Sequence, residues 1–374
     1  MSQENFFNKE KVNFKKIVIN NANFSLLRND LKLLNELRGK KLPNKKIKIN
    51  NSNIFFKDNF GEIVSIIKVN KTVLFFDDKK LLNFFNLKGQ LFNMPFLLDI
   101  QKHIDPNKYE QINFSVKPLE LSIINKFIMG KNELINGENT FSILNSRVNT
   151  KYNIKEKLIT FRSDNSRLDS AQINYNGKLS INPFDLDLDI KLKNYKVSKL
   201  LNKNPIMIEL IRSGLLYNDN ISINTSIVIN SDVKNEIFQK VKINFQIING
   251  KINFNKTMFV NDDIGSLNLS NSDIFFKDNK LLFNTDISID IKSSEKLYSL
   301  LNIKKSLRKN LKIILVNLDY NFLSNQIKFN NVRIDKKDVS SKFLKLINDF
   351  DENIDSNFNK NRRLISELLK AYEG

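Results

Sequence analysis

Residues 221 to 230 read ISINTSIVIN, with Ile or Thr at every second position from Ile221 to Ile229. The positions between them are mostly Ser and Asn, so one flank of the segment is apolar and the other is polar. Successive side chains of a β-strand point to opposite faces, and this alternation therefore predicts a strand with one buried face and one wet face.

The same alternation recurs along the chain, and an antiparallel sheet with one solvated face is its usual setting. Dipeptides that favour tight turns separate the runs: Asp58-Asn59, Asn176-Gly177, Asn249-Gly250 and Asp278-Asn279. The sequence therefore predicts a mainly β fold with short helices, built from hairpins.

A few amphipathic segments predict helices. Between residues 24 and 38, Leu27, Leu31 and Leu34 share one helical face, and Gly39 ends the run. Two further apolar stripes after residue 338 predict an α-helical C-terminal tail. The expected organisation is a β-rich segment over residues 1–170, a second one continuous with it over 171–337, and the tail over 338–374.

Internal repeats support a repetitive architecture. Residues 51–59, NSNIFFKDN, recur as residues 271–279, NSDIFFKDN. Residues 89–99 and 177–187 share a Gly-x-Leu-x-x-x-Pro-Phe-x-Leu-Asp spacing, and Asp-Ile-Lys precedes a Leu-Leu-Asn triplet at both 189–202 and 290–302. We interpret the repeated unit as strands followed by a short helix.

The residues that most enzymes and metal sites need are scarce. Cys is absent, which excludes disulfides and thiolate metal ligands. His103 is the only histidine and lies in a polar stretch that we expect to be a solvated loop. Asp185, Asp187 and Asp189 fail as a calcium loop because Ile190 stands where Gly is required, so we expect them on the solvent face of a strand. We predict no catalytic, cofactor or metal residues, and no enzymatic activity.

The net charge of +20 is spread along the chain, and its densest group is Lys304, Lys305, Arg308 and Lys309. Solvated surface lysines are the simplest interpretation, with binding of a polyanion or of lipid headgroups as the alternative. No apolar stretch approaches the roughly 20 residues that span a bilayer, and Met1 to Lys16 has no signal-peptide hydrophobic region.

The sequence resembles a known family. Residues 176–190 followed by Val197 to Leu201 are similar to the recurring strand and short-helix unit of AsmA-like proteins, and so is the run from Asn249 through Ile274 to Leu301. The resemblance covers most of residues 17 to 335. It implies an elongated, curved antiparallel sheet (a β-groove, or taco-like repeat), anchored in the inner membrane by an N-terminal helix and projecting into the periplasm.

The family is linked to phospholipid transport and outer-membrane assembly. The resemblance thus implies a non-enzymatic envelope protein that holds or conducts phospholipid acyl chains along an apolar groove, without a cofactor and without nucleic acid as a partner. The anchor is missing from this sequence, which predicts either a piece of a longer protein with an upstream membrane-anchored segment or attachment in another way, for instance through an envelope protein partner. A cytoplasmic location stays open because no signal is visible.

The apolar flanks of the predicted strands supply the candidate groove-lining residues: Ile54, Phe56, Leu186, Leu188, Ile190, Ile223, Ile227, Ile243, Phe245, Ile274, Phe276, Ile287 and Ile289. These side chains must be buried against something, either a second sheet in a closed core or acyl chains in an open groove. The alternative functions are a structural or adhesive β-repeat protein that binds another protein and, third, polyanion binding.

Overall fold

The computed structural model describes residues 16–27, 30, 40–58, 60–105, 107–130, 134–198, 211, 213, 215–233, 236–277, 280–324, 326–348 and 358–372. Strands make up 63% of the chain and helices 11%, and the fold class is a β-solenoid of about 5 turns with short C-terminal helices. The prediction of a mainly β protein with a helical C-terminus is confirmed at this level.

The chain divides into two compact units, residues 1–156 and residues 157–374, which we call unit 1 and unit 2. The sheet of unit 1 consists of β1 (Lys16–Asn20), β2 (Asn23–Leu27), β3 (Lys46–Lys57), β4 (Ile63–Asp77), β5 (Leu82–Leu91), β6 (Met94–His103), β7 (Glu110–Val116), β8 (Leu121–Met129), β9 (Ile135–Ile143) and β10 (Ser146–Lys155), with a 3-10 turn, η2 (Lys117–Leu119), between β7 and β8.

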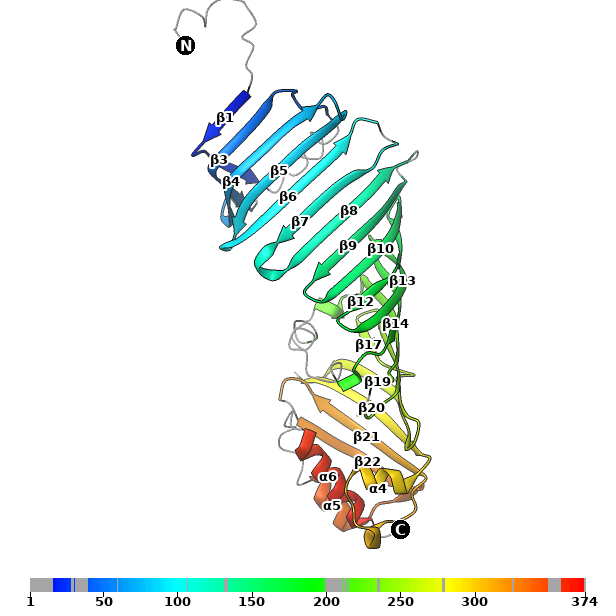
Figure 1. The fold of residues 1–374 in the computed structure, drawn as a ribbon. Helices are drawn as coiled ribbons and strands as arrows, with labels where there is room; N and C mark the ends of the chain where they lie inside the picture. Colours follow the sequence, from blue (N-terminus) through cyan, green and yellow to red (C-terminus); the bar gives the residue numbers. More distant parts are fainter. Residues whose placement is uncertain are drawn as a thin grey trace, which may run out of the picture. The chain divides into compact units, whose positions relative to one another are not determined.

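Strands β3 to β10 form an antiparallel meander, in which each strand pairs with the next one in the sequence. β1 and β2 both pair in parallel with β3. Figure 1 shows the successive strands of unit 1, from blue to green, lying side by side. Local pairing of this kind follows from the short turns between alternating runs.

The strands of unit 2 are β11 (Leu158–Ser163), β12 (Ser166–Leu168), β13 (Ala171–Ile181), β14 (Phe184–Lys193), β15 (Ile221–Asn230), β16 (Lys240–Ile248), β17 (Lys251–Asn253), β18 (Met258–Asn261), β19 (Gly265–Lys277), β20 (Lys280–Ile291), β21 (Ile313–Asn321), β22 (Gln326–Ile334) and β23 (Lys337–Asp338). Its helices are η4 (Leu215–Tyr217), α4 (Ser294–Leu300), η5 (Lys305–Leu307), α5 (Ser341–Asn348) and α6 (Phe358–Ala371).

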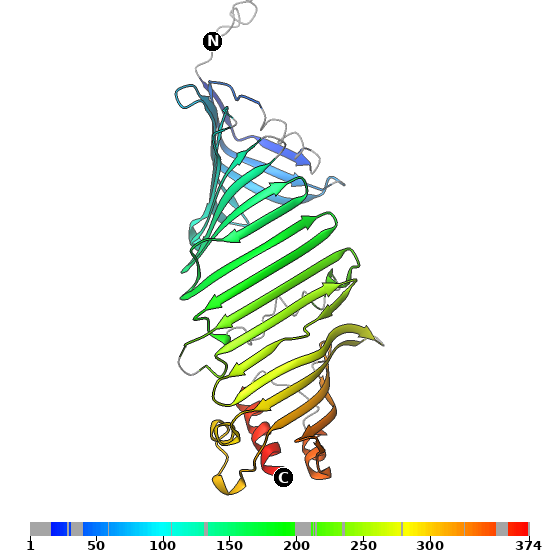
Figure 2. The same ribbon diagram turned by 90° about the vertical axis from the view of Figure 1, so that its right-hand side faces the viewer.

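Pairing in unit 2 is antiparallel except between β14 and β15, which are parallel. Figure 2 shows the long hairpins of this unit, coloured green to yellow. Because β14 and β15 run the same way, a crossing connection and not a tight turn joins the end of β14 to the start of β15.

The nine-residue repeat marks the same local structure in both units. Asn51 and Asn271 each have φ of +47°, and the register of β19 with β20 shifts at Asn271, whereas β3 keeps one register with β4 on both sides of Asn51. Ser52 and Ser272 follow, almost fully buried, and each Oγ donates to the carbonyl two residues earlier, at 2.9 and 3.0 Å. Asn tolerates this left-handed backbone better than most residues, which explains its presence at both positions.

A broken strand lies against each of the two strands that carry the repeat, β3 and β19. β1 and β2 pair with β3 before and after Asn51, and β18 and β17 pair with β19 before and after Asn271. The repeat in the sequence therefore corresponds to a repeated arrangement of three strand segments.

The second sequence echo, residues 89–99 and 177–187, lies in two hairpins whose registers differ. Gly89 pairs with Phe96 across β5 and β6, whereas Gly177 pairs with Leu188 across β13 and β14. In the third echo, residues 290–302 form the end of β20 followed by α4, while residues 199–210 lie outside the described residues.

Two of the sequence-based expectations need correction. Asn176-Gly177 is not a turn but lies inside β13, whereas Asn249-Gly250 is one, with φ of +49° and +67°. Residues 24–27 belong to β2 and not to a helix, because pairing with β3 places Leu26 opposite Phe56. Of residues 28–38 only Asp30 is described, so the rest of that predicted helix lies outside the described residues, as does the predicted turn at 278–279.

The C-terminal helices bury their apolar stripes in unit 2. Phe343 and Ile347 of α5 and Leu369 of α6 are each at most 4% exposed and pack with Tyr298 of α4 and Ile334 of β22. The apolar residues that recur at helical spacing in the sequence are thus the residues on the buried side of each helix.

Candidate apolar surface

An apolar ladder crosses one face of the unit 1 sheet. Strand register places one large apolar side chain from each of six neighbouring strands directly opposite the next: Leu87, Leu98, Phe114, Ile123, Phe141 and Val148. Leu87 is buried and the other five are half-buried. Because residues opposite each other lie on the same face, these side chains form one continuous apolar row.

On the opposite face of the same strands, the residues next to the ladder are mostly polar. There the Asn86 amide donates to the Asp99 carboxylate, Gln111 Nε2 donates to Asn113 Oδ1 at 2.9 Å, and Thr140 Oγ1 donates to Asn149 Oδ1 at 2.9 Å. Through these neutral and charge-assisted hydrogen bonds, the polar side chains of this face find their partners within the same row. The one-sidedness predicted from the alternation is therefore present in unit 1.

Three strand glycines lie opposite aromatic residues. Gly89 pairs with Phe96, Gly137 with Tyr152, and Gly177 of unit 2 with Phe161. A Cβ on Gly89 would be 3.2 Å from the Phe96 ring, and one on Gly137 would be 2.3 Å from the Tyr152 ring. An aromatic ring lying over a strand glycine fills the space of the absent side chain and keeps the apolar row continuous.

One edge of unit 1 carries an exposed apolar side chain at every described hairpin turn. The turns after β3, β5, β7 and β9 share an edge because alternate strands run in opposite directions. Their apolar residues are Phe60, Phe92, Leu119 and Leu144, which are 92%, 72%, 43% and 70% exposed. Phe92 and Leu144 also have φ of +48°, a conformation that favours Gly or Asn over a bulky residue.

Two predicted groove residues lie in unit 1. Ile54 and Phe56 are half-buried in β3, and Ile54 pairs with Ile67 of β4, which in turn pairs with Leu91 of β5. That register puts Ile54 and Phe56 on the same face as the apolar ladder.

The other predicted groove residues share one face of unit 2. Leu186 pairs with Ile223, and Ile190 pairs with Ile227, which pairs with Ile243. The same face carries the remaining members of the set: Leu188, Phe245, Ile274, Phe276, Ile287 and Ile289. Strand alternation alone was enough to group these side chains correctly on one face.

Segments of unit 2 cover much of this face. Val197 of the crossing connection packs with Ile229 and Val241, and Ile211 and Leu216 pack on Ile274. Ile274 is 1% exposed, whereas Phe276 is 52% exposed and meets Tyr217 edge to face at 5.3 Å. The three clusters of buried apolar residues in the described chain all lie in unit 2.

Sequence reasoning did not single out the ladder of unit 1. Its strands alternate less regularly, since Phe84 and Phe85 point to opposite faces of β5. The period-two run from Ile135 to Ile143, with Gly137 and Phe141 in phase, is a signal that could have identified β9.

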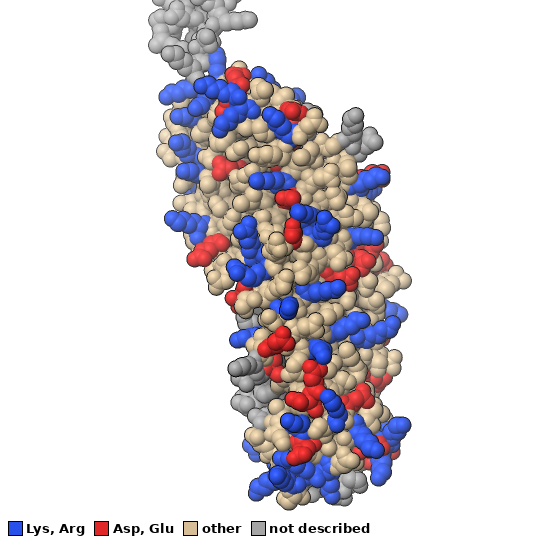
Figure 3. Space-filling model, turned by 45° about the vertical axis from the view of Figure 1, so that its right-hand side comes forward, with Lys and Arg blue, Asp and Glu red and all other residues tan. Residues whose placement is uncertain are grey.

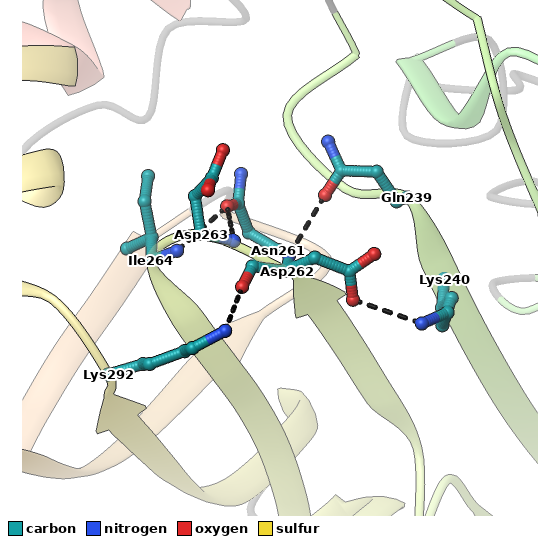
Figure 4. Close-up of polar contacts among 7 residues, drawn as sticks. All are labelled: Gln239, Lys240, Asn261, Asp262, Asp263, Ile264 and Lys292. Carbon is teal, nitrogen blue, oxygen red and sulfur yellow. Dashed lines mark hydrogen bonds and ion pairs between the residues drawn. The ribbon is translucent and has the colours of Figure 1, made fainter.

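A polar network fixes the turn between β18 and β19 (Figure 4). Asn261 Oδ1 accepts from the backbone amides of Asp263 and Ile264, at 3.0 and 2.9 Å. Lys240 pairs with the Asp262 carboxylate at 3.0 Å, and Lys292 Nζ donates to the Asp262 carbonyl at 2.7 Å. The Lys240 and Lys292 ammonium groups and the Asp262 carboxylate are all bonded within the network, so we assign it a structural role.

The chemistry for catalysis is sparse in the described residues. His103 is the last residue of β6, half-buried and edge-on to Tyr109 at 5.8 Å, and not in a solvated loop. Asp185, Asp187 and Asp189 are exposed on β14, and Asp187 accepts from Asn224 at 3.1 Å, as their position in the alternation predicts. No group of three or more potential metal ligands occurs in the described part of the chain.

No helix in the described ranges is both long enough and apolar enough to cross a bilayer. Comparison with known proteins gives no match to a protein-family model, to a curated protein or to a solved structure.

Proposed function

We propose that unit 1 holds lipid acyl chains against its apolar ladder, as part of a non-enzymatic envelope protein of AsmA type that supports outer-membrane assembly. The observation that carries the proposal is the row of half-buried apolar side chains from Leu87 to Val148. The periplasmic location and the membrane association implied by the family resemblance belong to the same proposal.

The dimensions of the ladder suit a single acyl chain. Neighbouring strands are about 4.8 Å apart, so six strands carry the row over roughly 24 Å. A bilayer core of roughly 30 Å is two acyl chains thick, and one chain therefore fits along the row. Each methylene that leaves water on such a surface contributes about 0.8 kcal/mol, which makes partial coverage sufficient for binding.

The exposed turns provide a route for a lipid to reach the ladder. Phe92 lies in the turn that joins β5 to β6, and Leu144 lies in the turn that joins β9 to β10. Apolar side chains at these tips can enter the outer layer of a membrane while the strands stay in water. The bulky residues at positive φ favour this role, since a turn selected for stability alone would have Gly or Asn there.

Binding of another protein is the second candidate, and the packing of unit 2 favours it. There the chain covers the matching face with its own segments, which indicates that this type of face can be closed by protein. The proposal for lipid is accordingly limited to unit 1. A protein partner on the ladder would contribute side chains where we place acyl chains.

Two substitutions in unit 1 test whether lipid binding depends on the ladder or on surface hydrophobicity in general. Phe114→Asn places an amide in the ladder, whereas Phe84→Asn makes the same change on the opposite face of the sheet, where the Phe84 ring lies 5.4 Å from that of Phe75 at a tilt of 50°. Both phenylalanines are half-buried. We expect purified protein to retain phospholipid, detected by mass spectrometry of an organic extract, and Phe114→Asn to reduce the amount far more than Phe84→Asn.

A delipidated wild-type protein that takes up no phospholipid from vesicles would overturn the proposal. Equal loss in both variants would also count against it, because the ladder would then have no special part in binding. Circular dichroism of the two variants shows whether each one is folded.

A further inference from the structure

The end of unit 2 that carries α4 and η5 is strongly basic. Between residues 294 and 312 a single acid, Glu295, accompanies a larger set of cations: Lys296, Lys304, Lys305, Arg308, Lys309 and Lys312. Figure 3 shows Lys and Arg side chains gathered at the lower end of the view, where the chain of unit 2 ends. Repulsion among these cations is unfavourable unless an anion offsets it.

A cavity lies within this basic segment. Its volume is about 410 Å³, it is open to solvent, and its walls come from both sides of the turn that follows α4: Ser294, Glu295, Tyr298, Lys305, Arg308, Lys309 and Asn310. The cavity therefore has three cationic side chains and one carboxylate on its walls.

The three cationic side chains on the cavity wall differ in how firmly they are held. Arg308 Nε donates to the Ile303 carbonyl at 2.9 Å, and its Nη1 lies 4.0 Å from the Glu295 carboxylate, which is mostly exposed. Lys305 and Lys309 are exposed and make no ion pair in the described part of the chain. Arg308 is thus held in place by the backbone, while the two lysines can move towards a ligand.

Tyr298 supplies an observation independent of charge. It is 0% exposed, lines the cavity, and has a hydroxyl without a hydrogen-bond partner among the described residues. Burial is the main reason that the pKa of Tyr298 is raised, and the nearby Lys309 backbone amide, which does not reach hydrogen-bond geometry, works against the rise. A buried polar atom without a partner is unfavourable, and a ligand acceptor would remove that cost once a small shift of the neighbouring side chains opened the hydroxyl to the cavity.

We propose that this cavity binds a phosphate group, held by Lys305, Arg308 and Lys309, with the Tyr298 hydroxyl as a neutral donor. A phosphate offers several strong acceptor oxygens and matches both the planar guanidinium and mobile ammonium groups. The cavity exceeds the volume of a phosphate alone, so it admits part of the molecule to which the phosphate is attached. A small phosphorylated compound and a lipid headgroup present the same chemistry here.

Isothermal titration of the full chain with inorganic phosphate, at roughly physiological ionic strength, tests the site. We expect the double variant K305Q/K309Q to bind about tenfold more weakly, since two charge-assisted contacts are lost. The matched control K277Q/K280Q removes two exposed lysines of the same unit at the β19–β20 hairpin and should bind as the wild type does. Y298F should weaken binding severalfold without lowering stability, because the hydroxyl has no partner before phosphate binds.

Vesicle flotation distinguishes the two sources of the phosphate group. Association with vesicles of phosphatidylcholine and phosphatidic acid, but not phosphatidylcholine alone, that free phosphate competes away and K305Q/K309Q loses would assign the site to a headgroup. Phosphate binding with the same order of variants but without vesicle association would assign it to a soluble compound. Either result supports the proposal.

The proposal is overturned if inorganic phosphate does not bind, if K277Q/K280Q loses as much affinity as K305Q/K309Q, or if Y298F leaves the affinity unchanged. It does not rest on the lipid-binding function of unit 1. Phe114→Asn should leave phosphate binding intact, so failure of one proposal is distinguishable from failure of the other.

Discussion

At the scale of single residues, two strand glycines differ in what an added methyl group would meet. A Cβ on Gly177 would lie 2.5 Å from the backbone carbonyl oxygen of Asp187, which cannot move without disturbing the β13–β14 pairing. A Cβ on Gly137 would be closest to the tip of the Tyr152 ring, which can rotate away at the cost of the hydrogen bond from its hydroxyl to Asn125. We expect G177A to lower the free energy of unfolding in urea by about 2 kcal/mol, and G137A by clearly less. If G137A were the more destabilising variant, contact with the aromatic ring, and not with the backbone, would determine how well each position tolerates alanine.

Tyr217 gives a prediction about alkaline pH. Burial raises the pKa of its hydroxyl from the usual 10.0 to about 12, and the hydroxyl has no hydrogen-bond partner in the described residues. The unfolded chain loses this proton near pH 10 and the folded chain only near pH 12, so the contribution to stability is lost as pH rises across that window. Y217F should therefore show a smaller fall in unfolding free energy between about pH 10 and 12 than the wild type. Substituting the exposed Tyr109 with Phe serves as the control.

At the scale of elements, the hairpin turns of unit 1 couple stability to the proposed function. Phe92 and Leu144 each have φ of +48°, a backbone conformation that costs an apolar L-residue about 1 kcal/mol. The double variant F92N/L144G should thus be more stable in urea but should take up less phospholipid from vesicles. A matched change at the opposite edge, Leu81→Asn, also relieves a positive φ, of +52°, and should raise stability without affecting uptake. Unchanged uptake in F92N/L144G would remove these turns from the lipid route.

Several elements could be predicted from the sequence because their information is local. The alternation around Ile223 and Ile287 identified strands, and the repeated Asn-Ser pair at residues 51 and 271 coincides with the same left-handed backbone position twice. Asn176-Gly177 was misassigned, because a dipeptide does not reveal that Phe161 lies over the glycine from a neighbouring strand. Residues 24–27 pair in parallel with β3, and nothing in the local sequence indicates that pairing.

The candidate site could be predicted only in part for the same reason. Alternation showed which side chains share a face, and it grouped Ile190, Ile227 and Ile243 correctly. It could not show that Val197 and Leu216 pack on that face in unit 2, since the crossing connection gives no period-two signal. Tyr298 could not be identified from sequence either, because an unpartnered hydroxyl is visible only in coordinates.

At the scale of the whole molecule, the two units bury their apolar faces to different extents. Ile229, Ile247 and Leu281 of unit 2 are 0% exposed, and each belongs to one of the buried apolar clusters of that unit. In unit 1 the ladder residues beyond Leu87 stay half-buried. Local opening is easier where few apolar contacts hold a strand, so we expect β7 to β9 to exchange amide hydrogens faster than β15 and β16.

Hydrogen exchange with and without lipid then distinguishes binding on unit 1 from a general effect of the membrane. A ligand that binds only the folded form of a unit stabilises that unit, so phosphatidylcholine vesicles should slow exchange in β5 to β10 and leave β13 to β16 unchanged. Phe114→Asn should abolish the slowing, whereas Phe84→Asn on the other face should preserve it. Equal slowing in both units, or slowing that survives Phe114→Asn, would place the lipid elsewhere than on the ladder. Mass spectrometry of peptides from each strand provides the measurement, because the strands of the two units yield separate peptides.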